Sequence, residues 1–475
     1  MRRTKIVCTL GPATDSYATI KNLIKAGMNV ARINMSHGDY TQHAERIALV
    51  KRARQEMNTA VAIMMDTKGP EIRIRTFKGG KVTLREGATF TLTTKECEGD
   101  ETRVAVTYEE LPSYVKEGDA ILINDGLIEL TVESVNKTDV VCKVKNGGEL
   151  SNRKSINLPG ISIDMPYISD ADREDMLFGI AQDVDYFALS FVRCKEDVRC
   201  VKTLLNQNGG NKIQLISKIE NREGVDNFKE ILAECDGAMV ARGDMGVEIP
   251  FEELPGIQKE MIKYCYNAGK KVITATQMLE SMINNPRPTR AEISDVANAI
   301  YDGTSAIMLS GETAVGKYCV ETVKTMAKIA EKAESGISFK SRFMAMETEM
   351  KTITDAISHA TVAAAYDLNA KAIIALSQSG FTSRKVSRFR PQCPIIAATL
   401  SEKAYHQLAM NWGVVPVMSA RQEDSMELFS HSVDCARTTG LIQEGDLVVI
   451  TGGFPVGISG NTNTMRIEIV GGDIR

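Results

Sequence analysis

The feature that most limits the fold of this 475-residue chain is a repeated alternation of short strand-type runs with polar segments compatible with helices. Such alternation predicts parallel strands with crossover helices, because neighbouring parallel strands need a long connection. Eight strands of this kind close a barrel. We therefore predict an α/β protein built on a (β/α)8 TIM barrel, with strands at 5–11, 29–36, 60–67, 185–191, 213–220, 237–244, 271–278 and 305–311.

The segment 70–168 interrupts this alternation between the third and fourth runs. It is rich in Thr, Val, Gly and Glu, and it contains short strand-type runs of its own. Pro and Gly close to both of its ends stop regular structure. We predict an inserted β-domain that covers the barrel mouth as a lid, so that the barrel consists of 1–69 and 169–345.

The composition excludes several functional classes. Apolar residues make up 43% of the chain and charged residues 25%, as in ordinary globular proteins, and the net charge is −4. Without a basic excess, we expect no nucleic-acid partner. The ten cysteines contain no CxxC pair, which argues against zinc and against a disulfide framework. We find neither a secretory leader nor an apolar stretch of about 20 residues, so we expect a cytoplasmic protein without a membrane partner.

Polar side chains gather at the carboxyl ends of several predicted strands. Side chains at i and i+2 of a strand share one face, and barrel enzymes build their active sites from these ends. Together the endings predict a site on one rim of the barrel. They are Arg32, Asn34 and Ser36; Asp66 and Thr67; Lys218 and Glu220; Arg242 and Asp244; and Thr274 and Thr276.

Two of these endings suit phosphoryl transfer. Glu220 and Asp244 are hard carboxylate ligands on adjacent strands, suited to a Mg2+ ion that completes its shell with substrate and water. Lys218 beside them would neutralise a phosphoryl group in transfer, because this chemistry depends mainly on charge and position. Arg32 and Arg73 could each clamp anionic oxygens with two N–H groups. Taken singly, each motif is more simply a solvated polar face or an ion pair.

Asn34, Ser36, Asp66 and Thr67 form a second oxygen-rich group, with one formal negative charge. Such a group suits a weakly held monovalent cation better than a transition metal. Capping of strand ends and turns by the same side chains is an equally good interpretation of these residues alone.

Residues 346–475 follow a charged linker and return to an α/β alternation, which predicts a carboxyl-terminal α/β domain. In it, the run from Ser377 to Thr382 follows a predicted strand and opens a basic helix. Small hydroxyl residues and Gly at the start of a helix can cradle a phosphate. Plain N-capping is the simpler interpretation of this motif by itself.

Eight motifs, in the same order along the chain, closely resemble those of the pyruvate kinase family. They are KIVCTLGPA, ARINMSHG, MDTKGPEIR, NLPG, SKIEN, ARGDMGVEI, TATQMLESM and MLSGETA, and the carboxyl-terminal run ITGGFPVGISGNTNTMRI is similar too. The resemblance covers nearly the whole chain. It implies a barrel, an inserted small β-barrel lid, a carboxyl-terminal α/β regulatory domain, allosteric activation by a phosphorylated metabolite, and a homotetramer.

The resemblance also implies a kinase that moves the phosphoryl group of phosphoenolpyruvate to ADP, giving ATP and pyruvate in the last step of glycolysis. Mg2+ (or Mn2+) and K+ are its expected cofactors. By motif, the catalytic residues are Lys218, Arg73, Thr276 and Ser310, and the substrate contacts are Arg32, Lys218, Gly243, Asp244 and Thr276. The nucleotide would contact Asn34, Met35, Ser36, His37, Arg73 and Lys154; Mg2+ would bind Glu220 and Asp244, and K+ would bind Asn34, Ser36, Asp66 and Thr67.

The residue at position 71 affects whether K+ is expected to be needed. Some members of the family carry Lys at this position, where an ammonium group could replace K+. The resemblance therefore implies that a chain with Glu71 needs K+.

The resemblance weakens at the effector pocket. Gln378 and Phe381 stand where some members place basic residues, so a phosphate ligand is expected while its identity stays open between fructose 1,6-bisphosphate, ribose 5-phosphate and AMP. The expected contacts are Ser377, Gln378, Ser379, Gly380, Phe381, Thr382, Ser459, Gly460 and Asn461.

Two other functions compete with this one. Other phosphoenolpyruvate-using barrels and metal-dependent aldolases also place Glu and Asp ligands on adjacent strands, but they need neither Lys218 nor an inserted lid. A non-catalytic sugar-phosphate-binding protein would be expected to have lost Lys218, Glu220 or Asp244, and all three are present.

Overall fold

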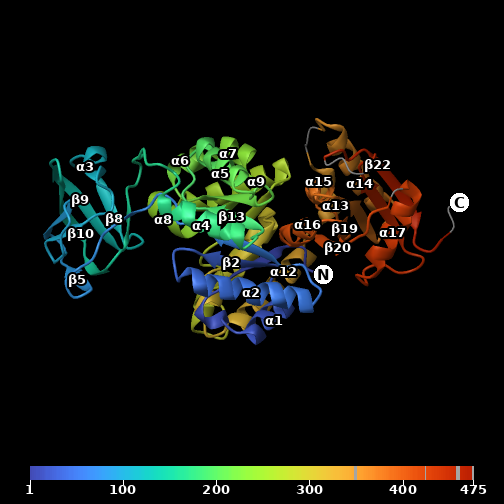
Figure 1. Cartoon of the computed structure of the whole chain (residues 1–475), viewed down its shortest axis with the longest axis horizontal. Coiled ribbons are helices and arrows are strands. Elements are labelled where there is room, and N and C mark those ends of the chain that lie inside the picture. The colour runs from blue at the N-terminus through green and yellow to red at the C-terminus, as the bar shows by residue number, and fades with distance from the viewer. Residues whose placement is uncertain (347–349, 423, 456–459, 473–475) are drawn as a thin grey trace.

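The computed structural model describes residues 1–346, 350–422, 424–455 and 460–472. Three units lie in a row along the longest axis of the molecule (Figure 1). The inserted strands lie at one end, the barrel lies in the middle, and the carboxyl-terminal sheet lies at the other end. The amino terminus lies at the junction of the barrel with the carboxyl-terminal unit, where Gly413 N donates to Arg3 O at 3.0 Å.

The parallel strands of the middle unit close into a barrel in the order β1-β17-β16-β15-β14-β13-β3-β2, which confirms the predicted (β/α)8 fold. Runs such as KIVCT in β1 are buried along their whole length, because one face meets the barrel interior and the other meets the helices. The strands are β1 (Lys5–Thr9), β2 (Val30–Asn34), β3 (Ala62–Asp66), β13 (Tyr186–Leu189), β14 (Gln214–Ile219), β15 (Gly237–Ala241), β16 (Lys271–Ala275) and β17 (Ala306–Leu309).

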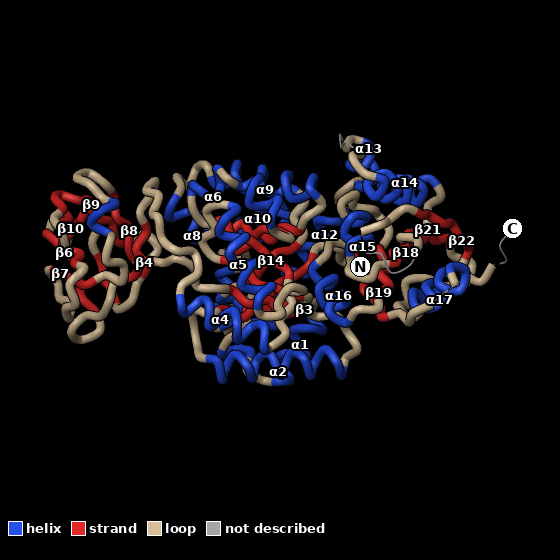
Figure 2. Tube along the Cα trace, turned by 45° about the horizontal axis from the view of Figure 1, so that its top comes forward, coloured by secondary structure: helices blue, strands red, loops and turns tan. Residues whose placement is uncertain are grey.

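Helices surround these strands on the outside (Figure 2). Their ends follow local capping rules: α10 begins with a capping box, in which Thr289 and Glu292 bind each other's backbone N–H, and ends at Gly303, whose φ of 102° favours glycine. The outer helices are α1 (Tyr17–Ala26), α2 (Tyr40–Glu56), α4 (Asp170–Ala181), α5 (Lys195–Gln207), α6 (Arg222–Asp226), α7 (Phe228–Glu234), α9 (Leu254–Ala268), α10 (Arg290–Asp302) and α12 (Cys319–Ser335). Shorter turns are η1 (Pro12–Thr14), α8 (Arg242–Glu248), η2 (Glu280–Ile283) and α11 (Gly311–Ala314).

The inserted segment forms a sheet in the order β4-β12-β8-β9-β10-β6-β7, with β11-β5 as a separate pair. Arg75 N donates to Ala105 O at 2.7 Å and Thr107 N to Arg73 O at 2.9 Å, so the two edges of the sheet meet and it curls into a small barrel. Its elements are β4 (Ile72–Arg73), β5 (Lys81–Leu84), β6 (Thr89–Thr93), β7 (Arg103–Ala105), α3 (Leu111–Tyr114), β8 (Ala120–Ile123), β9 (Ile128–Val135), β10 (Asp139–Asn146), β11 (Gly148–Ser151) and β12 (Ser155–Asn157).

The carboxyl-terminal unit is a five-stranded sheet in the order β20-β19-β18-β21-β22, in which only β22 runs antiparallel to its neighbour. The strands are β18 (Ala372–Leu376), β19 (Ile395–Thr399), β20 (Val414–Met418), β21 (Leu447–Gly452) and β22 (Thr464–Ile469). The helices are α13 (Phe339–Met344), α14 (Ile353–Asp367), α15 (Phe381–Ser387), α16 (Glu402–Gln407), η3 (Leu408–Met410) and α17 (Ser425–Arg437).

The carboxyl-terminal unit closes the amino-terminal end of the barrel. Met410 of η3 joins the apolar cluster inside the barrel, beside the first residues of several strands. Tyr186, the first residue of β13, donates its hydroxyl to Gln407 O at 2.5 Å. Lys5, the first residue of β1, donates to Val414 O at 2.7 Å. Because the amino-terminal end of the barrel is covered in this way, the rim left uncovered by this unit is the opposite one, at the carboxyl ends of the strands.

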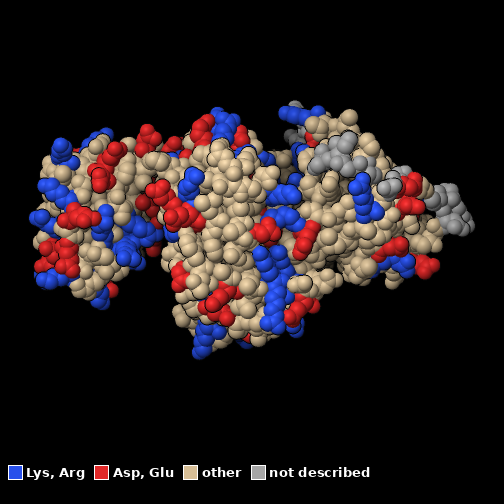
Figure 3. Space-filling view, in the orientation of Figure 1, with Lys and Arg blue, Asp and Glu red and all other residues tan. Residues whose placement is uncertain are grey.

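On the face shown in Figure 3, acidic and basic side chains are interspersed, and basic ones form a band along the junction of the barrel with the carboxyl-terminal unit. Mixed charge of this kind fits the small net charge of −4. Among the helices in the described residues, none is both long enough and apolar enough to cross a bilayer.

Candidate active site

Four charged side chains meet at the carboxyl ends of β2, β3 and β14. Arg32 donates from Nε and Nη2 to the two carboxylate oxygens of Asp66, at 2.8 and 2.6 Å. Lys218 Nζ lies 3.4 Å from Asp66 Oδ2 and 2.9 Å from Glu220 Oε1. All four side chains are buried. Two cations and two anions therefore form one compact cluster whose formal charges cancel.

The neighbours of each group set its protonation state. Burial alone would lower the pKa of Lys218, but the carboxylates of Glu220 and Asp66 outweigh burial and raise that pKa above its ordinary value. Burial alone would raise the pKa of Asp66, but Arg32 and Lys218 hold it below its ordinary value. Glu220 differs, because burial raises its pKa to about 7, with Lys218 opposing and Asp244 reinforcing the rise. Lys218 thus stays an ammonium, and a further cation would stabilise the Glu220 carboxylate.

Glu220 keeps acceptor capacity on one of its two oxygens. Its Oε2 accepts from Phe191 N at 2.6 Å, whereas the buried Oε1 has the Lys218 ion pair but no well-directed hydrogen bond. Asp244 lies near enough for its negative charge to act on Glu220. No third His, Cys, Asp or Glu completes a metal site with them within the described residues. Two hard carboxylates with open acceptor capacity match Mg2+, which takes its other ligands from substrate and water.

Asp244 reaches this position from a helix instead of a strand. β15 ends at Ala241, and α8 begins at Arg242, so the predicted strand 237–244 is too long. Asp244 lies in the first turn of α8, where the helix dipole favours an acidic side chain. Strand alternation therefore predicted Asp244 at this rim from a strand that ends three residues earlier.

Thr276 also lies beyond its predicted strand. β16 ends at Ala275, and Thr276 follows with a φ of 68°, a left-handed conformation that is costly for a β-branched residue. Its Oγ1 accepts from Gly243 N at 2.8 Å, which brings the two predicted substrate contacts together. Thr274, in contrast, is fully buried and bonded to Thr304 at 3.0 Å, so it does not face the mouth.

Arg242 holds the turn that contains Thr276. Its guanidinium donates to Ala275 O at 3.0 Å and to Thr276 O at 2.5 Å. Asp295 of α10 pairs with the same guanidinium at 2.7 Å. The strained turn is therefore held by a charged fork that is itself anchored on a neighbouring helix.

Ser310 follows β17 at the start of α11. Its backbone N–H donates to Glu312 Oε2 at 2.7 Å, while its hydroxyl is buried and has no hydrogen-bond partner in the described residues. A buried hydroxyl without a partner needs an explanation, and at the carboxyl end of a barrel strand a substrate would supply the missing hydrogen bond.

The predicted nucleotide contacts lie around the rim. Arg73, in the inserted unit, donates to Glu71 Oε2 at 2.7 Å and to Arg153 O at 2.8 Å. Lys154 follows in the same segment, and its carbonyl accepts from Ile74 N. The run from Asn34 to His37 leaves β2 in a turn in which Asn34 Oδ1 accepts from Ser36 N at 3.1 Å. Of this turn, Ser36 and His37 are exposed, while Met35 is buried.

The predicted K+ ligands come from two adjacent strands, since Asn34 lies opposite Asp66 in the β2–β3 register. Thr67 Oγ1 accepts from Ser190 N at 3.1 Å. Asp66 Oδ1 accepts one hydrogen bond, from Arg32 Nε, and keeps acceptor capacity. The oxygens therefore fit a weakly held monovalent cation, because Arg32 and Lys218 already balance the single carboxylate.

The sequence reasoning missed Ser190. Its Oγ accepts from Lys218 Nζ at 2.7 Å and donates to Thr67 O at 2.7 Å, so it links the lysine to the neighbouring strand ending. The signal was present, because Ser190 is the polar residue near the end of the predicted strand 185–191. The next residue, Phe191, has a φ of 54° and turns its N–H towards Glu220.

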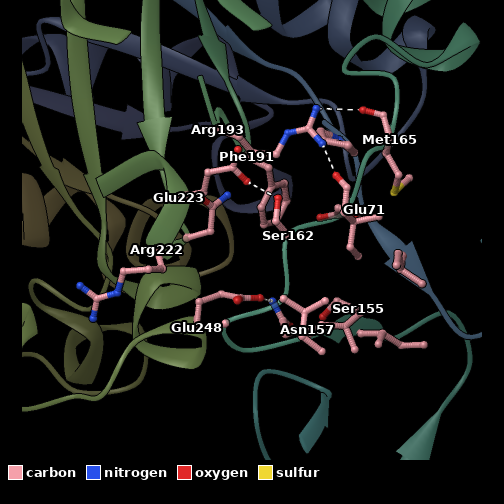
Figure 4. A pocket seen from close by; sticks show the side chains of 18 of the residues that line it. Glu71, Ser155, Asn157, Ser162, Met165, Phe191, Arg193, Arg222, Glu223 and Glu248 are labelled. Carbon is pink, nitrogen blue, oxygen red and sulfur yellow. Dashed lines mark hydrogen bonds between the residues drawn. The ribbon is translucent and has the colours of Figure 1, made fainter. Parts of the chain in front are cut away.

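A cavity of about 410 Å3 lies between the barrel and the inserted unit, beside this cluster (Figure 4). Asn157 Nδ2 donates to Glu248 Oε1 at 2.9 Å, and Ser162 Oγ donates to Glu223 Oε2 at 2.8 Å, across the junction of the two units. Phe191, Asn221 and Glu71 also line the cavity. The inserted unit thus borders the space next to the charged cluster.

The predicted effector residues line a separate cavity of about 780 Å3 in the carboxyl-terminal unit. Gly380, with a φ of 77°, precedes α15 and is not among the lining residues, and Ser459 lies outside the described residues. Arg421 is a cationic side chain of the lining that the sequence reasoning did not consider. The predicted residues that line the cavity are Ser377, Gln378, Ser379, Phe381, Thr382, Gly460 and Asn461.

Comparison with known proteins agrees over almost the whole length. The family model described as pyruvate kinase, barrel domain, matches residues 1–323, and that described as pyruvate kinase, alpha/beta domain, matches 355–468. A pyruvate kinase of Clostridium acetobutylicum is 50% identical over 99% of this chain and 100% of its own. One of Staphylococcus saprophyticus is 48% identical over 100% of this chain and 81% of its own. The chain therefore belongs to the pyruvate kinase family and is a phosphotransferase of glycolysis.

Proposed function

We propose that the chain transfers the phosphoryl group of phosphoenolpyruvate to ADP at the cluster around Lys218, giving pyruvate and ATP. The observation that carries this assignment is a buried ammonium group held by Ser190, Glu220 and Asp66 at the barrel mouth. A fixed positive charge in a water-poor site stabilises a transferring phosphoryl group without reorganisation, which is the main requirement of this chemistry.

The surrounding residues have distinct tasks in this proposal. Lys218 neutralises the phosphoryl group as it moves, and Arg32 and Arg73 contact its oxygens. Gly243 and Thr276, which are hydrogen-bonded to each other at 2.8 Å, bind the substrate carboxylate. Proton delivery to the enolate falls to the hydroxyls of Thr276 and Ser310, of which the latter has no partner in the described residues.

Glu220 and Asp244 would hold Mg2+ or Mn2+, because Glu220 Oε1 has an ion pair but no directed hydrogen bond and keeps acceptor capacity. When bound, the ion supplies charge stabilisation to the phosphoryl and enolate oxygens. Asn34, Ser36, Asp66 and Thr67 would hold K+ beside the same cluster. The turn from Asn34 to His37, together with Arg73 and Lys154 of the inserted unit, would contact the nucleotide, with that unit acting as a lid.

We further propose that the protein works in the cytoplasm as a homotetramer. All ten cysteines lie in the described residues and are free thiols, as in a reducing compartment. The tetramer is proposed from the family resemblance.

The decisive test of the proposed activity is the substitution of Lys218. Lys218→Met keeps the length of the side chain and removes its charge, so we expect kcat with phosphoenolpyruvate, ADP and Mg2+ to fall on the order of 10³-fold. Lys81→Met is the matched control, because Lys81 is an exposed partner of Glu149 in the inserted unit. A coupled assay for pyruvate measures both, with circular dichroism to verify the fold. Near-normal turnover of Lys218→Met would refute the role.

For the cavity that contains Ser377 and Thr382, we propose an activating phosphorylated metabolite. The support is the hydroxyl-rich loop before α15 and the cation Arg421 in its lining. Fructose 1,6-bisphosphate, ribose 5-phosphate and AMP, each titrated at subsaturating phosphoenolpyruvate, should include one that raises the rate, and Thr382→Val should abolish that response. If the rate responds to none of the three, the activation proposal is wrong.

A further inference from the structure

His43 is a buried histidine of α2 that the proposed chemistry does not use. The residue is 2% exposed, and neither ring nitrogen has a hydrogen-bond partner among the described residues. A buried polar group without a partner is uncommon, because it has lost its hydrogen bonds to water and gained none in return. An apolar side chain would fill this space at no such cost, so packing alone does not account for a histidine here.

The ring lies against the turn that connects β2 to α2 and contains the proposed nucleotide contacts. A Cβ atom added to Gly38 would lie 3.3 Å from His43 Cε1 and 3.5 Å from His43 Nε2, so this edge of the ring faces the backbone of Gly38. The φ of Gly38 is 86°, a conformation that favours glycine. Ser36, His37 and Gly38 are exposed, so the turn has solvent on one side and His43 on the other.

The backbone hydrogen bonds of this turn are long. Met35 N donates to Asp66 O at 3.4 Å, and His37 N donates to Asn34 O at 3.3 Å. Both distances exceed the usual range for N–H···O bonds, which is about 2.7–3.2 Å. Ser36 N donates to Asn34 Oδ1 at 3.1 Å. Support from the buried side therefore matters for the position of the turn.

The surroundings keep the ring of His43 neutral at neutral pH. Burial has the largest effect and lowers its pKa, and Arg46 of the same helix lowers it further. The backbone of His37, Asp175 of α4 and Asp39 at the N-cap of α2 act in the opposite direction. A backbone group that raises the pKa of an imidazole is a carbonyl that attracts its N–H, so the His37 carbonyl lies near the ring. A neutral imidazole has one N–H to donate to it.

We propose that His43 is a positioning residue for the nucleotide, whose Nε2–H donates to the His37 carbonyl when ADP binds and so fixes the turn from Asn34 to Gly38. The inference rests on the proposed function, in which this turn contacts ADP. Both nitrogens of His43 are buried, so the ring acts through the turn and does not touch the nucleotide. ADP binding would thus supply the hydrogen bond that the buried ring lacks.

Three substitutions separate the hydrogen bond of the ring from its bulk. His43→Phe keeps a flat ring and removes both nitrogens, whereas His43→Gln can place an amide nitrogen where Nε2 lies, and His43→Asn where Nδ1 lies. We expect KM for ADP to rise about tenfold in His43→Phe and His43→Asn, which corresponds to about 1.4 kcal/mol, and to stay within about threefold in His43→Gln. KM for phosphoenolpyruvate should change by less than about twofold in all three.

A calorimetric titration of ADP with Mg2+ into each variant makes the same comparison without turnover. His406→Gln serves as the control, because His406 is also buried and has an unpartnered ring nitrogen, but belongs to the carboxyl-terminal unit. It should leave ADP binding unchanged. Circular dichroism verifies the fold, and if His43→Phe does not fold, the comparison of His43→Gln with His43→Asn still separates a hydrogen bond from packing.

The outcomes distinguish this inference from the proposed function. An unmodified protein that binds ADP but forms no pyruvate would disprove the phosphoryl transfer, while the order of the ADP affinities would still test His43. Equal ADP affinity in the unmodified protein and in His43→Phe, or equal losses in His43→Gln and His43→Asn, would overturn the role of His43 and leave its ring as packing only.

Discussion

At the scale of single residues, the barrel mouth contains a charge-balanced group, with Arg32 and Lys218 against Asp66 and Glu220. The sequence predicted these four as polar strand endings, because alternation places side chains on one face. It could not predict their pairing, since register between strands sets which cation meets which anion. For the same reason the sequence did not predict a role for Ser190, since that role depends on a hydrogen bond of 2.7 Å to Lys218 on the next strand.

Glu71 gives a prediction at this scale. Burial raises the pKa of Glu71, Arg73 opposes that rise, and the charges of Asp244 and Lys218 also act on it, so the side chain lies close to the charged cluster. An ammonium at this position would supply positive charge near the proposed K+ ligands. We expect turnover of the unmodified protein to fall about 100-fold without K+, and Glu71→Lys to remove most of that dependence.

The measurement is pyruvate formation in K+-only, Na+-only and cation-free buffers at fixed Mg2+. Glu149→Lys, at an exposed position of the inserted unit, serves as the control for a general change of charge. Equal turnover of the unmodified protein in all three buffers would contradict the K+ requirement.

At the scale of elements, the sequence located every barrel strand but misplaced some carboxyl ends. The predicted strands 237–244 and 271–278 end at Ala241 and Ala275. In both cases polar residues beyond the strand continue an alternating pattern, although the backbone has already turned into α8 or into the left-handed turn at Thr276. Tertiary hydrogen bonds from Arg242 stabilise that turn, and a local pattern does not contain them.

Arg242 should therefore act as a positioning residue. Arg242→Gln removes the charged fork on Ala275 O and Thr276 O, and we expect kcat/KM for phosphoenolpyruvate to fall about 10- to 100-fold. KM for ADP should change little, because the turn lies on the substrate side in our proposal. Arg199→Gln, on the exposed surface of α5, is the control. Unchanged kcat/KM in Arg242→Gln would show that the turn holds its conformation without the fork.

At the scale of the whole molecule, the three units were predicted from changes in composition along the chain. The closure of the barrel by the carboxyl-terminal unit was not predicted. Met410 belongs to a short apolar run that looks like ordinary core of its own unit, and only the docking of the two units places it inside the barrel. Contacts of this kind join residues far apart in sequence and leave no periodic signal.

Met410 gives a prediction for the assembly of the units. Met410→Ala leaves a void in the apolar cluster inside the barrel, so we expect the unfolding free energy to fall by about 2–5 kcal/mol. Met344→Ala, at a side chain that is 65% exposed, should be nearly neutral. Chemical denaturation followed by Trp412 fluorescence measures both. Equal stability of the two variants would mean that Met410 is not part of the packed interior.

The position of Met410 also sets an order of events during synthesis. A ribosome adds about 5–20 residues per second, so the barrel strands, complete at Leu309, wait several seconds or more before residue 410 leaves the exit tunnel. Until then Tyr186 and the buried end of Lys5 lack the partners that cover them in the folded protein. The nascent barrel therefore exposes an apolar opening that a chaperone could recognise, and the finished enzyme conceals it.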